Sequence, residues 1–160
     1  MTLTVGTDTY ISLGDADTYF ANRLYSTIWT GADSADREKA LRMAAKALDR
    51  ESYLGKITSY TQTMAWPRSG VQDSAGREIE RTAVPAAVVD AQCELALTYL
   101  ADDPTQDDGT RGVRRMVADT VTMEYDGRAP VRRLPDFVFA LIRPFLGSGS
   151  PSTASAPLVF

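Results

Sequence analysis

The sequence contains no histidine and only one cysteine, Cys93. Without histidine, the chain cannot form a Ser-His or Cys-His nucleophile pair, and no imidazole is available as a metal ligand. A single cysteine excludes an intrachain disulfide, which is typical of proteins in a reducing compartment. We therefore expect a protein that is not an enzyme and holds no metal or cofactor, with Cys93 buried on an apolar helix face.

Long uncharged hydrophobic runs are also missing, and no stretch approaches the roughly 18 apolar residues that a membrane-spanning helix needs. We expect no membrane partner. Basic residues are in the minority, with 17 Lys and Arg against 21 Asp and Glu, a net charge of −4. This balance argues against a protein whose main task is to grip phosphate backbones, although a local basic patch could still meet nucleic acid.

What the chain does have is an ordinary globular composition, 44% hydrophobic and 24% charged, at a length that suits one packed domain. Apolar residues at helical spacing predict a helix at about 13–25, in which Leu24 continues the stripe, and a second at about 35–53. A third, central helix is predicted to begin at Pro85.

The second half of the chain adds a last predicted helix at 134–146 and a β-hairpin at about 113–125, where β-branched residues alternate. The predicted fold is therefore mainly α, a small bundle of about four helices with one β-hairpin, within residues 1–146. Residues 147–160 are uncharged and of low complexity, which predicts a flexible C-terminal arm.

Residues 56–83 show no periodicity and carry several breakers, which predicts a long ordered loop that wraps the helices. Its most distinctive tripeptide is Trp66-Pro67-Arg68. We interpret these three residues as a loop anchor that either caps the helical core or faces a partner.

Arginines gather in the second half of the chain. Residues 111–143 hold seven arginines against four acidic residues, a local charge of +3. A solvated surface and an interface or channel-lining role both explain such a cluster. The candidates for a subunit interface or channel are Arg111, Arg114, Arg115, Arg128, Arg132 and Arg133.

Five segments occur in an order that resembles a known group of proteins. They are TVGTDTYISLGDADTYF, AWPRSGV (65–71), VPAAVVDAQCELAL (84–97), VRRMVADTVTMEY and RRLPDFVFALIRPFL (132–146), and together they cover most of residues 3–146. The order resembles that of tailed-phage head-to-tail connector proteins, also called adaptor or head-completion proteins. Members of this group are often labelled DnaT-like single-strand-binding proteins.

The resemblance implies a structural subunit of the virion neck, made in the bacterial host cytoplasm. It would assemble as a closed ring of about twelve copies under the portal, joining head and tail and extending the DNA channel. The implied partners are the portal protein, neighbouring copies and the next neck or tail-completion protein, while packaged DNA passes through without sequence-specific binding. The apolar residues Pro157, Leu158, Val159 and Phe160 would then bind the portal.

The alternative function is a single-stranded DNA-binding replication factor. Such proteins combine a basic groove with aromatic platforms for the bases. The chain is acidic, and Tyr19, Phe20, Phe137 and Phe145 fall mostly on predicted core faces of helices. The sequence therefore favours the connector interpretation over the DNA-binding one.

Overall fold

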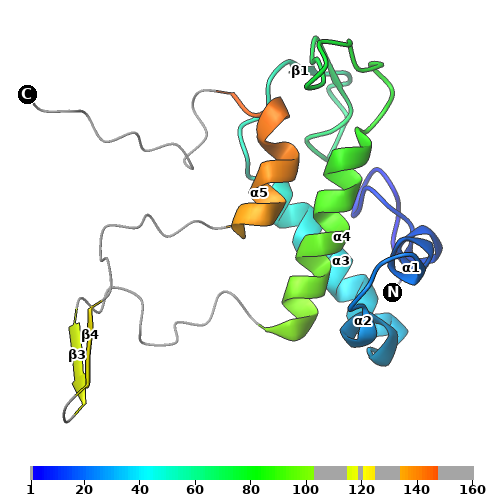
Figure 1. The fold of residues 1–160 in the computed structure, drawn as a ribbon. Coiled ribbons are helices and arrows are strands. Elements are labelled where there is room, and N and C mark those ends of the chain that lie inside the picture. Colours follow the sequence, from blue (N-terminus) through cyan, green and yellow to red (C-terminus); the bar gives the residue numbers. More distant parts are fainter. Residues whose placement is uncertain (1, 103–114, 119–120, 125–133, 148–160) are drawn as a thin grey trace, which may run out of the picture.

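The computed structural model describes residues 2–102, 115–118, 121–124 and 134–147 (Figure 1). The predicted mainly helical fold with a hairpin is confirmed. The helices are α1 (Leu13–Ala21), α2 (Thr27–Gly31), α3 (Ser34–Leu48), α4 (Ala86–Ala101) and α5 (Asp136–Ile142), which continues into a 3-10 turn (Arg143–Phe145). The strands form two antiparallel pairs, β1 (Lys56–Ile57) with β2 (Arg68–Ser69), and β3 (Arg115–Ala118) with β4 (Val121–Glu124).

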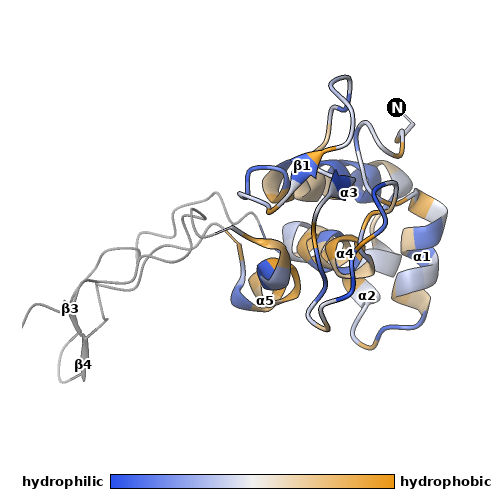
Figure 2. Cartoon of the chain, turned by 90° about the horizontal axis from the view of Figure 1, so that it is seen from above, coloured by the Kyte–Doolittle hydropathy of each residue, from blue (hydrophilic) through white to orange (hydrophobic). Residues whose placement is uncertain are grey.

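Helix α4 is the centre of the core. It packs against α2, α3 and α5, and Figure 1 shows it crossing in front of α3 with α5 beside it. The hydrophobic parts of α4 and α5 lie close together in Figure 2. Burial of apolar side chains is the main stabilising contribution here. The buried residues of α4 are Val88, Ala91, Gln92, Cys93, Leu95, Ala96 and Leu97.

One of these buried residues is polar and ties the N-terminal segment to the core. The Gln92 side-chain amide donates to Thr9 Oγ1 at 2.6 Å and to the Leu41 carbonyl at 2.9 Å, and its oxygen accepts from the Tyr10 backbone N–H at 3.0 Å. Because a buried amide without partners is costly, these three bonds fix residues 9–10 against α3 and α4.

Helices α1 and α3 begin at side-chain caps. Ser12 Oγ accepts from the Asp15 backbone N–H at 3.1 Å, and an Asp33 carboxylate oxygen accepts from the Asp36 N–H at 2.8 Å. Such caps satisfy backbone donors that the first helical turn leaves free.

The predicted helix ends were wrong. Helix α1 ends at Ala21 and not near residue 25: Asn22 forms its C-cap, where the backbone N–H donates to the Tyr19 carbonyl at 3.2 Å, and Tyr25 then takes a left-handed conformation with φ of 58°. Leu24 therefore leaves the apolar stripe and is 79% exposed. Helix α3 ends at Leu48 and not at residue 53, and the last helix becomes a 3-10 turn at Arg143. The predicted loop of residues 56–83 contains the β1–β2 pair, and α2 was not predicted at all.

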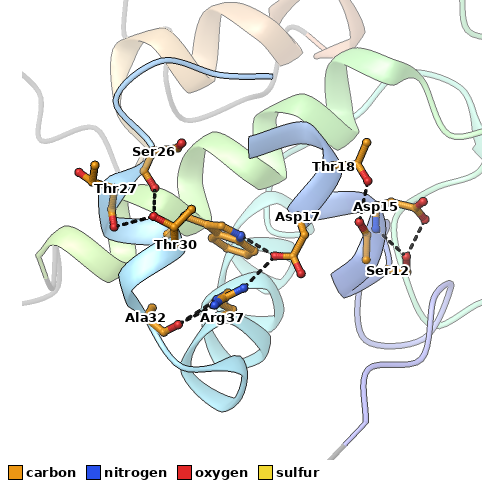
Figure 3. Close-up of polar contacts among 11 residues, drawn as sticks. Ser12, Asp15, Asp17, Thr18, Ser26, Thr27, Thr30, Ala32 and Arg37 are labelled. Atoms are coloured by element: carbon orange, nitrogen blue, oxygen red, sulfur yellow. Dashed lines mark hydrogen bonds and ion pairs between the residues drawn. The ribbon is translucent and has the colours of Figure 1, made fainter. Parts of the chain in front are cut away.

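Helix α2 is held by a polar network at the corner between α1 and α3 (Figure 3). One Asp17 carboxylate oxygen accepts from the Trp29 indole N–H at 2.7 Å and from Arg37 Nη1 at 3.0 Å. Arg37 also donates to the Ala32 carbonyl from Nε and Nη2. The Trp29 ring is buried and stacks on Phe20, with ring centroids 4.3 Å apart. These contacts lock the three helices together.

Candidate nucleic-acid interface

Charge is distributed unevenly along the chain. Residues 8–38, the acidic region, hold six acidic side chains and two arginines, a local net charge of −4. Residues 39–72, the cationic region, hold six Lys and Arg and two acidic side chains, a local net charge of +4. Within the helical part of the structure, Figure 1 shows α2, from the acidic region, near the lower end and β1, from the cationic region, near the upper end. A chain that is acidic as a whole therefore has a basic part.

The cationic region contains 21 consecutive residues, 52–72, without any Asp or Glu. We call this stretch the anion-free segment. Strands β1 and β2 pair within it, with Lys56 opposite Ser69 and Ile57 opposite Arg68. The pair approaches closely at Gly55, whose φ of 72° lies in the left-handed region that favours glycine. A Cβ atom there would meet the Ser69 carbonyl oxygen and, at 2.6 Å, Val71 Cγ2.

The guanidinium of Arg68 organises the anion-free segment. It donates to the carbonyl oxygens of Leu54 at 2.6 Å, Gly55 at 2.9 Å, Ala65 at 3.2 Å and Tyr53 at 3.3 Å. Backbone carbonyls orient the guanidinium and leave its positive charge in place. A carboxylate partner would cancel that charge. Arg68 therefore fixes the loop and contributes a positive field to its surface.

A groove of about 510 Å³ opens on this surface, lined by residues 55–60 and Arg68. The Tyr60 side chain is fully exposed, at 103% of its reference area, and Ile57 is 45% exposed. Lys56 is also exposed. The groove thus combines a flat aromatic face, an apolar side chain and two cations, which is the combination that single-stranded nucleic acids use for stacking and phosphate contact.

Further cations come from the last turn of α3 and the residues just after it, immediately before the anion-free segment. Lys46 and Arg50 are exposed, and within the described residues neither they nor Lys56 forms an ion pair. The two cations nearer the start of α3 are paired, Lys39 with Asp36 at 2.7 Å and Arg42 with an aspartate at 3.9 Å. The free positive charge therefore lies toward the end of α3 that continues into the groove.

One acidic residue of the cationic region is directed into the protein. Asp49 accepts a hydrogen bond from the Tyr10 hydroxyl and one from the Ala65 backbone N–H at 3.3 Å. Burial raises the pKa of this carboxyl, although both hydrogen bonds act in the opposite direction. The same carboxylate raises the pKa of Tyr10, after the larger effect of burial. Asp49 thus holds α3 to the N-terminal segment and the loop.

The structure places the predicted loop anchor in two environments. Trp66 is 1% exposed and packs edge-on against Tyr53 and Phe145, with centroid separations of 5.5 and 5.6 Å. The bond between Trp66 and Pro67 is cis. Arg68 lies at the groove, so the tripeptide joins the core to the candidate interface.

Most of the other predicted site residues lie outside the described residues. They are Arg111, Arg114, Arg128, Arg132, Arg133, Pro157, Leu158, Val159 and Phe160. Arg115 begins β3, in register with Glu124 of β4.

The groove was not predicted from the sequence. The aromatic residues considered as possible base platforms were Tyr19, Phe20, Phe137 and Phe145, and they did not include Tyr25 and Tyr60, which are exposed. The predicted basic cluster consisted of neighbouring arginines, whereas Lys46, Arg50 and Lys56 are spaced singly. The absence of acidic residues from 52–72 was the signal that could have located the surface.

The single cysteine lies in the core. Cys93 is buried, and burial raises the pKa of its thiol to about 12, so a reactive thiolate does not form at neutral pH. No three Cys, Asp or Glu side chains gather there as a possible metal site. No helix of the described residues is long and apolar enough to cross a membrane.

Nearly the whole chain matches a known protein family. Residues 2–158 match the family described as "Putative DnaT-like ssDNA binding protein". Comparison with curated proteins and with solved structures finds no match.

The family match overturns the connector interpretation drawn from the five segments, because the family is described by DNA binding and not by a virion neck. The predicted partners were wrong with it: the portal, a ring of neighbouring copies, a further neck or tail protein, and DNA that only passes through. Portal binding by Pro157 to Phe160 and a channel of arginines lose their basis as well. The chain belongs to the family of DnaT-like single-stranded-DNA-binding proteins.

Proposed function

We propose that this protein binds single-stranded DNA and that the cationic region provides the contact surface. The observation that carries the proposal is the groove of the anion-free segment, where fully exposed Tyr60 stands beside Lys56 and no acidic residue occurs between 52 and 72. Membership of the family supports the same ligand.

In this proposal the cationic side chains contact phosphates and the tyrosine contacts a base. Lys46, Arg50 and Lys56 form no ion pair with other described residues and can meet successive phosphates, whose negative charge dominates nucleic-acid affinity. Tyr60 offers a face on which one base can stack, and stacking contributes roughly 1–3 kcal/mol per base. Most donors of Arg68 are already used by carbonyls, so it acts through its charge.

The proposal also predicts a preference for single strands. Stacking on Tyr60 requires a base that is free of its partner strand, which a duplex does not present. The net charge of −4 repels a polyanion at long range, so a few short-range contacts must supply the binding energy. We therefore expect binding that is modest in affinity and sensitive to salt.

A fluorescence-anisotropy titration tests this function. A labelled oligothymidine is titrated at several salt concentrations, with a duplex of the same length in parallel. For single strands the logarithm of the binding constant falls with the logarithm of salt concentration by about 0.7 per neutralised phosphate, so three cations predict a slope of about −2. Absence of binding at low salt, or equal binding of the duplex, would contradict the proposal.

A further inference from the structure

The loop between α1 and α2 exposes apolar side chains to solvent. Leu24 is 79% exposed, Tyr25 is 88% exposed, and Ile28 at the start of α2 is 45% exposed. We call these three residues the apolar loop. Single exposed apolar residues are common, but a run of large ones on one short loop marks a surface that meets another molecule.

The backbone of the apolar loop is clamped by Arg23. Its Nη1 donates to the carbonyl of Leu24 at 2.8 Å and to that of Tyr25 at 3.3 Å. Its Nε and Nη2 donate to the two carboxylate oxygens of Glu94 on α4, at 2.6 and 2.8 Å. Tyr19 adds a hydroxyl bond to Glu94 at 2.8 Å. The loop is therefore attached to the central helix.

Tyr25 pays a conformational cost in this arrangement. Among the described residues it is the only non-glycine residue with a positive φ, and the left-handed region is unfavourable for a bulky side chain. Such strain persists only where surrounding contacts impose it, and it is common at binding surfaces. The clamp keeps the apolar loop in one shape, which reduces the entropy lost on binding.

A groove of about 540 Å³ runs along α1 beside the loop. Its walls are Ile11, Asp15, Thr18, Tyr19, Asn22 and Arg23. Glu94 neutralises Arg23, so the uncompensated charge among these lining residues is the carboxylate of Asp15. The surrounding acidic region carries a net charge of −4. The groove thus carries one uncompensated carboxylate, that of Asp15, and lies beside the exposed apolar side chains of the loop.

From this combination we infer that the apolar loop and the groove along α1 dock an amphipathic, basic segment of another protein. The apolar side chains of the segment cover Leu24, Tyr25 and Ile28, and its lysines or arginines lie along the groove near Asp15. DNA does not fit here, because its phosphates would face the acidic region. The inference is independent of the proposed DNA-binding function.

The probe is a labelled peptide of leucine and lysine, with leucines at the i, i+3, i+4 and i+7 spacing of an amphipathic helix. A peptide of the same composition in scrambled order controls for charge alone. Binding is followed by anisotropy and by chemical-shift changes in the ¹⁵N-labelled full chain. Shifts are expected at residues 22–28 and along α1, with binding that weakens as salt is added.

Variants then separate docking from general attraction. The double variant Leu24→Ser with Tyr25→Asn removes the apolar groups, and asparagine tolerates the left-handed backbone, so the fold should survive. It should bind the peptide at least tenfold more weakly. Asp15→Asn should weaken binding about threefold and reduce its salt dependence. Met43→Ser removes an exposed apolar side chain on α3 and should change nothing.

Several outcomes would overturn the inference. Equal binding of the scrambled peptide, or unchanged binding by the Leu24→Ser and Tyr25→Asn variant, would show attraction without a docking surface. Shifts at residues 22–28 that depend on protein concentration alone would assign the surface to a second copy. Shifts there on addition of oligothymidine would assign it to DNA. Circular dichroism and the thermal midpoint establish that each variant is folded.

Discussion

Tyr60 and Tyr25 are both almost fully exposed, but they stand in surroundings of opposite charge. Tyr60 belongs to the cationic region with its local charge of +4, and Tyr25 belongs to the acidic region with −4. An exposed aromatic ring can stack on a base or cover an apolar side chain. The neighbouring charges decide which of these partners can approach, so one residue type serves two different surfaces.

The two surfaces are also held differently. Arg68 donates to four carbonyls and keeps its positive charge, whereas Arg23 donates to two carbonyls and to the carboxylate of Glu94, which cancels it. An arginine can thus fix a loop with or without adding charge to it. This difference explains how two arginine-braced loops acquire opposite ligand preferences.

The substitution with the largest expected effect is Gly55→Ala, in the anion-free segment. The new Cβ would collide with the Ser69 carbonyl and Val71, in a left-handed conformation that alanine disfavours. We expect a loss of about 3 kcal/mol in the free energy of unfolding. Gly76→Ala is the matched control, because its φ is 77° but no atom lies within 4 Å of the added Cβ, and it should lose about 1 kcal/mol. Equal losses in urea unfolding would contradict the role of the close approach.

Charge reversal on the cationic region comes next. Lys46→Glu with Lys56→Glu should weaken oligothymidine binding about thirtyfold, because two phosphate contacts become repulsions. Arg77→Glu with Arg81→Glu changes the net charge equally on another exposed loop and should weaken binding only slightly. Anisotropy titrations at several salt concentrations compare the two double variants. Similar effects of both would mean that binding depends on the net charge of the protein and not on the cationic region.

Substitutions of Tyr60 and Tyr25 compare the two surfaces directly by their effect on DNA affinity. Tyr60→Ala should weaken oligothymidine binding about tenfold, within the range of one lost stacking contact, while Tyr60→Phe should retain most of the affinity. Tyr25→Ala removes an equally exposed ring from the acidic region and should leave DNA affinity unchanged. A loss of affinity in Tyr25→Ala as large as in Tyr60→Ala would mean that DNA contacts both regions.

The long helices could be predicted from sequence because their apolar stripes are real core positions. Leu41, Ala44, Ala45 and Leu48 are all buried on α3, as their spacing indicates. Leu24 follows Phe20 at the same spacing and misled the prediction, since the helix end at Ala21 and the left-handed backbone at Tyr25 are not encoded in periodicity. Helix α2 was missed because five residues with one buried side chain give no periodic pattern.

The candidate DNA surface was harder to predict, for a physical reason. Lys46, Arg50, Lys56 and Arg68 are far enough apart in sequence that no basic cluster appears. Folding exposes three of them and turns Asp49 inward, so the surface charge differs from the sequence count. The pairing of β1 with β2 joins non-neighbouring segments and cannot be recognised from two-residue strands.

The smallest effect that we predict concerns the ion pair of Arg23 with Glu94, which holds the apolar loop. Burial raises the pKa of Glu94, but hydrogen bonds from Arg23 and Tyr19 outweigh it and hold the pKa below its ordinary value of 4.5. Between the folded pKa and pH 4.5, the unfolded chain therefore binds more protons than the folded one. The contribution of Glu94 to the free energy of unfolding is present above pH 4.5 and is lost as pH falls through the folded pKa. Glu94→Gln should lower the free energy of unfolding by about 1 kcal/mol at pH 7, because the ion pair is partly exposed. In urea unfolding at several pH values, the difference from the unmodified protein should shrink as pH falls below 4.5. A pH-independent loss in Glu94→Gln would mean that packing, and not the charge of the carboxylate, holds the apolar loop in place.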